Sequence, residues 1–336
     1  MKHAAAMIKT LFPLIAISLA IILGAGPAQA VTLYDDNDTK VDLYSRLYVF
    51  YANDGEGRIS GNDSRVGLRA STRVHDNLSV FARAEFRYDA SQRARGGIDI
   101  ERDEQDDITN VDSDSVFNDR RNTYVGLKGG WGQLMAGNFD SVYYQSVSHL
   151  LDLYEHEGFV ALGNGSTASR EDSVAYSSPN LHGFQLHGQV RHYEEEHEDT
   201  VSGDEEFVFQ VAGTYTLHAL TLGLGAVIEN EDAGFDETLF GFSAEYKITE
   251  ALSAMLMLEH LKDAGEEDYH AAIGAAYNYG QGDLYASVGQ DPDEETYFSV
   301  GANYKFSKPM RVFAEYCNGE GINPDDVITV GFRYDF

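Results

Sequence analysis

The chain has 336 residues, of which 55 are acidic and 24 are lysine or arginine, so its formal charge is −31 at pH 7. This excess of negative charge excludes nucleic acid as a partner, because nucleic-acid phosphates bind basic surfaces. The single cysteine, Cys317, excludes an intrachain disulfide framework. The mean hydropathy of −0.33 is unusual for a helical membrane protein but is compatible with a barrel whose lumen and loops are polar.

The first thirty residues have the three regions of a secretory signal peptide. Lys2 and Lys9 form a basic start, residues 11–23 are almost entirely apolar, and Ala28-Gln29-Ala30 supplies a small-x-small cleavage site. The apolar run is shorter than the roughly twenty residues that a membrane-spanning helix needs. We therefore expect residues 1–30 to be a cleaved signal peptide and residues 31–336 to form the mature domain, with a formal charge of −33 after loss of the two lysines.

Beyond this leader, apolar and polar residues alternate in segments that are separated by turn signals. A period of two indicates strands with one apolar face and one polar face. The first seven predicted strands are residues 39–53, 62–75, 78–90, 122–129, 133–138, 169–177 and 182–195. The other nine, which complete a set of sixteen, are residues 207–217, 220–228, 240–248, 252–261, 271–279, 284–290, 298–306, 312–316 and 328–336.

The last predicted strand shows the alternation most clearly. Its apolar positions are Ile328, Val330, Phe332, Tyr334 and Phe336, and its small or polar positions are Thr329, Gly331, Arg333 and Asp335. A strand that continues to an aromatic chain end is unusual in a soluble protein, where termini generally fray into polar tails. We expect the apolar positions to face lipid or a trimer interface, and Arg333 to face a polar lumen.

The connections between the predicted strands alternate between short turns and longer polar loops. The seven short turns lie at Asp76, Gly130, Asn180, His218, Thr249, Gly280 and Lys308. No part of the mature chain contains the roughly twenty apolar residues of a spanning helix, so it can cross a membrane only as a closed barrel. The even strand number and the two classes of connection predict an all-β, sixteen-stranded antiparallel transmembrane barrel. A soluble all-β fold is the alternative, but such sheets seldom exceed about ten strands.

Four segments together resemble the general, non-specific porins of Gram-negative outer membranes. They are residues 40–46 (KVDLYSR), residues 64–69 (SRVGLR), residues 123–128 (TYVGLK) and the Tyr-Asp-Phe ending. The resemblance covers essentially the whole mature chain. It implies an outer-membrane barrel that assembles as a homotrimer, contacts outer-membrane lipids and lipopolysaccharide, and has a long third loop folded into its lumen. It also implies passive diffusion of small hydrophilic solutes and ions, with no cofactor.

A long segment without strand character lies between residues 138 and 169, where the resemblance places the third loop. It carries the acidic residues Asp152, Glu155 and Glu157, and its apolar residues favour packing against an inner wall. The resemblance implies that these acids line a constriction. The family often has Pro-Glu-Phe-Gly where this chain has residues 155–159 (EHEGF), so which of the acids projects into the pore stays open.

The resemblance also implies a group of basic side chains on the wall opposite the third loop. The matching positions in this chain are Arg46, Arg65 and Arg170. A further arginine that is usual after the fifth strand falls at or beside Asn138 and is lost here. Two pairs can compensate for it, namely Arg120 with Arg121, or Arg83 with Arg87. For each arginine, the alternative is an ordinary solvated position in the lumen.

Acids that face bases across a narrow aqueous gap create a transverse field that sets ion preference, while the pore width sets the size limit. With 55 acids against 22 bases in the mature chain, we predict a cation preference. A sugar-specific channel is the main alternative, with Tyr44, Tyr48, Tyr88 and Tyr124 as candidate stacking residues. A barrel with a plugged lumen is a weaker alternative, since no separate plug domain is present. An outer-membrane hydrolase is also disfavoured, because the histidines are scattered and no Gly-x-Ser-x-Gly occurs.

Runs of acidic residues lie in the predicted exterior loops, at residues 101–107, 112–114, 194–199 and 204–206. Such runs are usually solvated faces, but their carboxylates are also suited to weak binding of divalent cations shared with lipopolysaccharide. The spacing lacks the glycine and terminal glutamate of an EF-hand, so we predict no defined metal site. The loop at residues 98–115 is a candidate contact with a neighbouring subunit.

Overall fold

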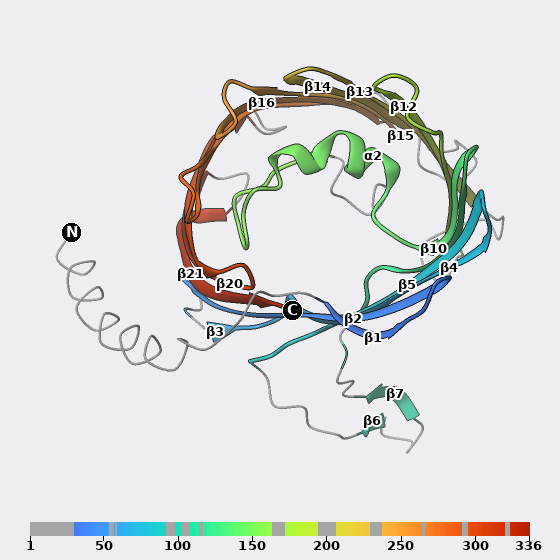
Figure 1. The fold of residues 1–336 in the computed structure, drawn as a ribbon. Coiled ribbons are helices and arrows are strands. Elements are labelled where there is room, and N and C mark those ends of the chain that lie inside the picture. Colours follow the sequence, from blue (N-terminus) through green and yellow to red (C-terminus); the bar gives the residue numbers. More distant parts are fainter. Residues whose placement is uncertain are drawn as a thin grey trace.

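The computed structural model is an all-β barrel whose strands form a closed ring (Figure 1). The structure describes residues 30–336 except 54–56, 58, 92–97, 103–107, 114–116, 118, 163–171, 194–205, 229–236, 264–265, 291–294 and 320–322. The predicted signal peptide, residues 1–30, therefore falls almost wholly outside the described residues. Among the residues described, no helix is both long and apolar enough to cross a membrane.

Within the described residues the main sheet has nineteen strands, of which β1 (Val31–Asp35), β3 (Ile59–Ser60) and β8 (Asp119–Arg120) are short. The other sixteen form the barrel. The first eight are β2 (Thr39–Ala52), β4 (Ser64–His75), β5 (Leu78–Tyr88), β9 (Thr123–Gly129), β10 (Gly132–Asn138), β11 (Ser173–Ser177), β12 (Phe184–Tyr193) and β13 (Glu206–Leu217). The last eight are β14 (Leu220–Ile228), β15 (Glu237–Lys247), β16 (Leu252–Asp263), β17 (Glu266–Asn278), β18 (Asp283–Gln290), β19 (Thr296–Ser307), β20 (Met310–Gly319) and β21 (Asn323–Asp335).

The barrel closes where its first long strand meets its last. β2 pairs antiparallel with β21, from Arg46 opposite Asp335 to Ala52 opposite Thr329. The other edge of β2 pairs with β4, and the first half of β2 pairs with β1. Backbone hydrogen bonds between Ser45 and Phe336 extend the seam to the end of the chain. Both edges of β2 therefore find a partner, as a membrane-spanning strand requires.

The sixteen-stranded antiparallel barrel predicted from the alternation is confirmed, and the differences lie at strand ends. The seventh predicted strand begins at Phe184 instead of residue 182, because His182 and Gly183 have φ angles of 58° and 95°, which belong to a turn. The sixth, β11, spans Ser173–Ser177 within the described residues, and residues 169–171 of the predicted strand lie outside them. The fifteenth, β20, extends further in both directions than the predicted residues 312–316.

The two faces of the closing strand point as predicted. Thr329 is 1% exposed inside the barrel, whereas Ile328 is 41% exposed on the outside. Arg333 faces the lumen, where it contacts Glu155. The outer wall as a whole presents large apolar side chains such as Leu224 and Ile273, which a lipid environment would cover.

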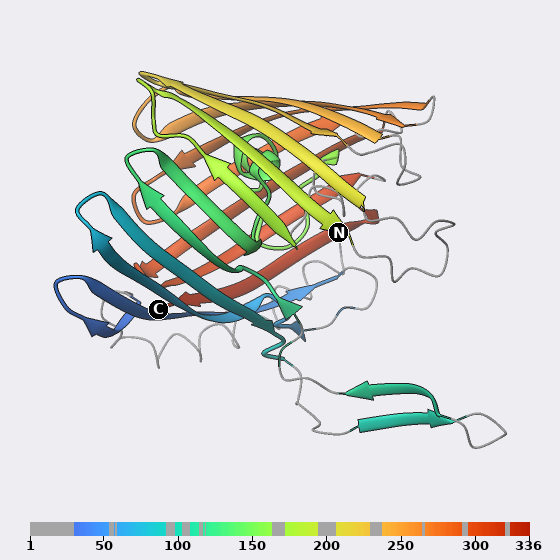
Figure 2. The ribbon, with the colours of Figure 1, turned by 90° about the vertical axis from the view of Figure 1, so that its right-hand side faces the viewer.

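Two elements lie apart from the barrel wall. β6 (Ile98–Arg102) and β7 (Ile108–Ser113) form a separate antiparallel hairpin, which projects away from the barrel in Figure 2. Inside the ring of Figure 1 lie the helix α2 (Val142–Ser146) and the 3-10 turn η1 (Ser148–Leu151). Both belong to the connection between β10 and β11, of which the structure describes residues 139–162. We call this segment the third loop.

The third loop packs on the inner wall through apolar side chains. Tyr143, Val147 and Leu151 are almost fully buried. They belong to one cluster with wall residues from β13 to β19, which include Val208, Val227, Leu239, Met255, Met257, Ala272 and Tyr297. Apolar residues in a loop are thereby removed from water, which explains why a long segment without strands remains compact.

Candidate channel constriction

Arginines stand directly opposite one another on the lumen face of five neighbouring strands, β20, β21, β2, β4 and β5. Arg46 on β2 pairs in register with Arg65 on β4, and Arg65 pairs with Arg87 on β5. A second row places Arg69 opposite Arg83, and a third places Arg311 on β20 opposite Arg333 on β21. Like charges in this arrangement destabilise a sheet. The rows therefore need acids between them.

Asp63 forms ion pairs with all three arginines of the first row. Its carboxylate forms ion pairs with Arg46 Nη1 (3.6 Å), with Arg87 Nε (3.3 Å) and with Arg65 Nη2. Asp63 lies in the turn that immediately precedes β4. One carboxylate shared by three guanidinium groups leaves this part of the wall with an excess of positive charge.

Glu85 on β5 is fully buried and pairs with arginines of the first and second rows. Its Oε2 accepts hydrogen bonds from Arg83 Nη2 (2.6 Å) and from the Tyr44 hydroxyl (2.9 Å). Its Oε1 lies 3.8 Å from Arg121 Nη1 and 4.0 Å from Arg65 Nη1. A buried carboxylate is stable only when cations and donors surround it, and this one has both.

Asp335 and the third-loop acid Glu155 pair with the third row, and Asp335 also pairs with Arg46 of the first row. Asp335 bonds Arg46 Nε (3.0 Å) and Arg333 Nε (2.8 Å). Glu155 accepts two hydrogen bonds from Arg333 Nη1 (3.0 and 3.1 Å) and lies 3.5 Å from Arg311 Nη1. The Glu155 side chain is 12% exposed. It therefore fastens the loop to the wall and does not project freely into the lumen.

Asp152 and Glu157 are the more accessible third-loop acids. Asp152 is exposed to the lumen and accepts a hydrogen bond from the Tyr144 hydroxyl. The protein around it partly desolvates the carboxylate and so raises the pKa of Asp152, which the bond from Tyr144 opposes. The side chain of Glu157 is 37% exposed and lies 3.8 Å from His156 Nε2. Desolvation also lowers the pKa of the neighbouring His149, which favours its neutral form.

The structure places most of the residues selected from the sequence in this region. Arg46 and Arg65 lie on the lumen wall, while Arg170 lies outside the described residues. The side-chain amide of Asn138, at or beside the position of the missing arginine, donates to the carbonyl of Arg120 (2.8 Å). The candidates for compensation, Arg83, Arg87 and Arg121, are all part of the cluster, whereas Arg120 contributes a backbone acceptor.

Sequence reasoning missed Arg311 and did not assign Arg333 to the site. The signal for both was present, since Arg311 has the same strand parity as the lumen-facing residues Phe313 and Glu315. Arg333 was predicted to face the lumen. Its pairing with Glu155 depends on where the third loop docks, which the strand pattern does not reveal.

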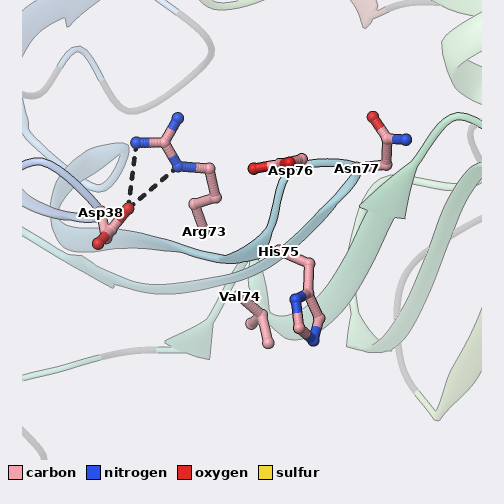
Figure 3. A pocket seen from close by; sticks show the side chains of 6 residues that line it. All are labelled: Asp38, Arg73, Val74, His75, Asp76 and Asn77. Atoms are coloured by element: carbon pink, nitrogen blue, oxygen red, sulfur yellow. Dashed lines mark hydrogen bonds and ion pairs between the residues drawn. The ribbon is translucent and has the colours of Figure 1, made fainter.

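A separate hollow lies at the short-turn end of the barrel, away from this cluster (Figure 3). It is an open space of about 450 Å³ lined by Asp38, Arg73, Val74, His75, Asp76 and Asn77. Two nitrogens of Arg73 lie 3.1 Å from Asp38 Oδ1, and Arg73 also donates to the carbonyl of Asn37 (2.7 Å). These bonds tie the β1–β2 turn to the end of β4, so the hollow has a structural explanation.

A closed sixteen-stranded barrel with an apolar exterior and a charged lumen defines the class of outer-membrane β-barrel proteins. Comparison with known families narrows the class. Residues 16–321 match the Gram-negative porin family, and the chain belongs to this family. It is an outer-membrane protein.

Two relatives illustrate the breadth of the match. A monosaccharide porin of Halomonas sp is 24% identical over 364 residues, which cover 90% of this chain and 93% of the relative. Outer membrane porin F of Escherichia coli (strain K12) is 24% identical over 383 residues, covering 96% and 99% of the two chains.

Solved structures show the same fold at lower identity. Salmonella typhi OmpF in complex with daunomycin has a TM-score of 0.68 at 16% identity, with 91% of this chain and all of that chain covered. The trimer form of Vibrio cholerae OmpT has a TM-score of 0.63 at 17% identity, with 89% of this chain and all of that chain covered.

Proposed function

We propose that this porin is a water-filled channel for the passive diffusion of small hydrophilic solutes and ions across the outer membrane. The observation that carries the proposal is the separation of charge within the lumen. Arginine rows cover the wall from β20 to β5, and the accessible acids Asp152 and Glu157 lie on the third loop. Such an arrangement orients dipolar solutes and passes ions without a binding step.

We further propose a preference for cations. Four acids, namely Asp63, Glu85, Asp335 and Glu155, pair with arginines and offset part of the positive charge of the wall. Asp152 and Glu157 have no arginine partner among the contacts of the described residues. The mature chain as a whole has a strong excess of acids, which also enriches cations at the mouths of the pore.

Single-channel recording in a planar bilayer tests both statements. We expect large ohmic steps and, in a salt gradient at 0.1 M, a reversal potential of cationic sign. Silent membranes would contradict the proposed diffusion channel. A reversal potential of anionic sign would contradict only the cation preference and would show that the wall arginines dominate.

A sugar-specific channel is the second candidate, because one relative is named a monosaccharide porin. The lumen offers little support for a track of stacking aromatic rings. The guanidinium groups of Arg69 and Arg83 lie 4.8 and 5.3 Å from the centre of the Tyr44 ring. Tyr48 is 1% exposed, because its ring packs against Phe313. Concentration-dependent block of the current by monosaccharides would favour this second function.

We also propose that the protein forms a homotrimer. The structural neighbour OmpT is named as a trimer, and the β6–β7 hairpin projects from this barrel where it can reach a neighbouring subunit (Figure 2). Unheated protein should migrate as a heat-labile trimer in native gels, with current steps in groups of three. A single monomeric band in all mild detergents would contradict this assembly.

We propose that the protein contacts outer-membrane lipids and lipopolysaccharide, and that its exterior acids bind divalent cations weakly. The acid runs at residues 101–107 and 194–199 lie mostly outside the described residues. Across the described part, no three His, Cys, Asp or Glu side chains are grouped to hold a metal ion. Titration with Ca²⁺ followed by the melting temperature of the trimer tests the cation proposal.

A further inference from the structure

A buried acid–histidine pair lies beneath the third loop, outside the arginine cluster. Glu259 on β16 and His270 on β17 are direct cross-strand partners. Both side chains are fully buried, and His270 Nδ1 lies 3.3 Å from Glu259 Oε2. The other ring nitrogen of His270 hydrogen-bonds the Tyr297 hydroxyl on β19 (2.9 Å). Buried charged groups need such compensation, so this pair requires an explanation.

Glu259 also forms three hydrogen bonds with the third loop. Its Oε1 accepts hydrogen bonds from the Tyr143 hydroxyl (2.9 Å) and the Ser148 hydroxyl (3.1 Å). Its Oε2 accepts one from the backbone N–H of Leu162 (2.8 Å). Tyr143 lies at the start of the loop and Leu162 at the end of its described part. A single wall carboxylate therefore holds both limbs of the loop.

The wall beside Glu259 is shaped to let the loop reach it. The row of cross-strand partners that contains Glu259 and His270 continues through Gly241 on β15 and Gly225 on β14. A methyl group at Gly241 would overlap the Tyr143 hydroxyl, and one at Gly225 would lie 2.9 Å from the Tyr143 ring. Tyr143 thus lies flat across two strands that carry no side chains there, with its hydroxyl directed at Glu259.

We propose that Glu259, oriented by His270, is a positioning residue that clamps both limbs of the third loop to the wall and thereby fixes the conductance of the channel. The inference rests on the proposed diffusion channel, because the loop occupies the lumen through which solutes pass. Hydrogen bonds to an ionised carboxylate are stronger than neutral ones. Neutralising Glu259 therefore weakens three loop contacts at once.

The test uses Glu259→Gln, Tyr143→Phe and the double variant in the full-length trimer. We expect each single variant to increase brief current closures by about tenfold, the factor that corresponds to losing one hydrogen bond to a charged group. The double variant should show no more current closures than Glu259→Gln alone, because both changes act on the same hydrogen bond between Tyr143 and Glu259. Tyr176→Phe is the matched control, since the Tyr176 hydroxyl bonds the carbonyl of Trp131 away from the loop.

Hydrogen exchange provides a readout that needs no current. In detergent micelles, amides of residues 142–162 should exchange about tenfold faster in both single variants than in wild type, with β13 unchanged. Wild-type exchange and wild-type current noise in folded Glu259→Gln and Tyr143→Phe would overturn the clamp, as would fully additive effects in the double variant. If Glu259→Gln does not fold, Tyr143→Phe decides, because it leaves the wall intact. A silent wild-type channel would overturn the proposed function, while exchange would still decide the clamp.

Discussion

The acids of the third loop differ in what they contact, and this difference separates attachment from selectivity. Glu155 is bound by Arg333 and Arg311 on the wall. Asp152 bonds Tyr144 within the loop itself and remains open to the lumen. A charge that is already paired contributes less to the field that a passing ion meets than an accessible one does. Selectivity should therefore depend most on the accessible acids.

Neutralising Asp152 and Glu157 together should reduce the preference for cations. In water, a unit charge about 4 Å from a passing monovalent ion changes the energy of that ion by about 1 kcal/mol, which corresponds to roughly fivefold in a permeability ratio. Reversal potentials in a KCl gradient measure the change, and Glu250→Gln, in the exposed turn before β16, is the control. The effect should shrink at 1 M salt, where screening acts over about 3 Å instead of about 10 Å. An unchanged ratio at 0.1 M would place the selective charges elsewhere.

Removing a wall arginine should act in the opposite direction. Arg65→Ala leaves Asp63 and Glu85 with one cationic partner fewer, so the lumen becomes more negative. We expect the cation preference to rise by a factor similar to that lost with a single acid. Arg73→Ala is a matched control on the same strand, because Arg73 binds Asp38 at the short-turn end. Equal responses of the two variants would contradict a special role for Arg65.

The pH dependence of selectivity should reflect the raised pKa of Asp152. A carboxyl group with a raised pKa takes up its proton at a higher pH than an ordinary aspartate does, and it then loses its negative charge. As pH falls, the cation preference should therefore begin to decrease above the usual range for aspartate. In Asp152→Asn this early part of the pH profile should be absent. Reversal potentials recorded between pH 7 and pH 3 provide the comparison.

The strands were readable from the sequence because a membrane barrel imposes the same period of two on every element. The docking position of the third loop could not be predicted from the sequence, because it depends on contacts between side chains that lie far apart in the chain. The bond between Tyr143 and Glu259 spans 116 residues, and the bond between Glu155 and Arg333 spans 178. The strand pattern shows which face a residue occupies but not which residue of another element it meets. Apolar residues in the loop predicted that it packs, without predicting where.

Glycines on the inner wall determine where the helix of the third loop can lie. A methyl group at Gly223 would overlap the carbonyl oxygen of Ser146, at the end of α2. Gly223→Ala should displace the helix at a cost of about 1–3 kcal/mol and change the single-channel conductance, while the barrel remains closed. Gly213→Ala, on the outer face with its nearest neighbour atom at 3.6 Å, should behave as wild type. Conductance and heat-modifiable migration together distinguish a moved loop from an unfolded barrel.

For the whole molecule, the decisive contact is the seam between β2 and β21, which joins the two ends of the barrel. Deleting residues 329–336 removes the paired part of β21 and leaves β2 with an open edge in a membrane. We expect no heat-modifiable barrel from this variant, because unpaired backbone groups cannot be satisfied in lipid. Deleting the β6–β7 hairpin, residues 98–113, removes no wall strand and should leave the barrel intact. A folded barrel from the first deletion would contradict the role of the seam.

The same seam has a consequence for how the protein reaches the membrane. Since β2 can pair with β21 only when the final residues are available, the barrel cannot close while the chain is still being exported. Until it closes, the barrel has two unpaired strand edges, and such edges are prone to pair with other chains. Because each unfolded chain carries an excess of acidic residues, separate copies repel one another in water. In the proposed cation-preferring channel, the same excess of acids would therefore act twice: in the finished pore and in the unfolded chain.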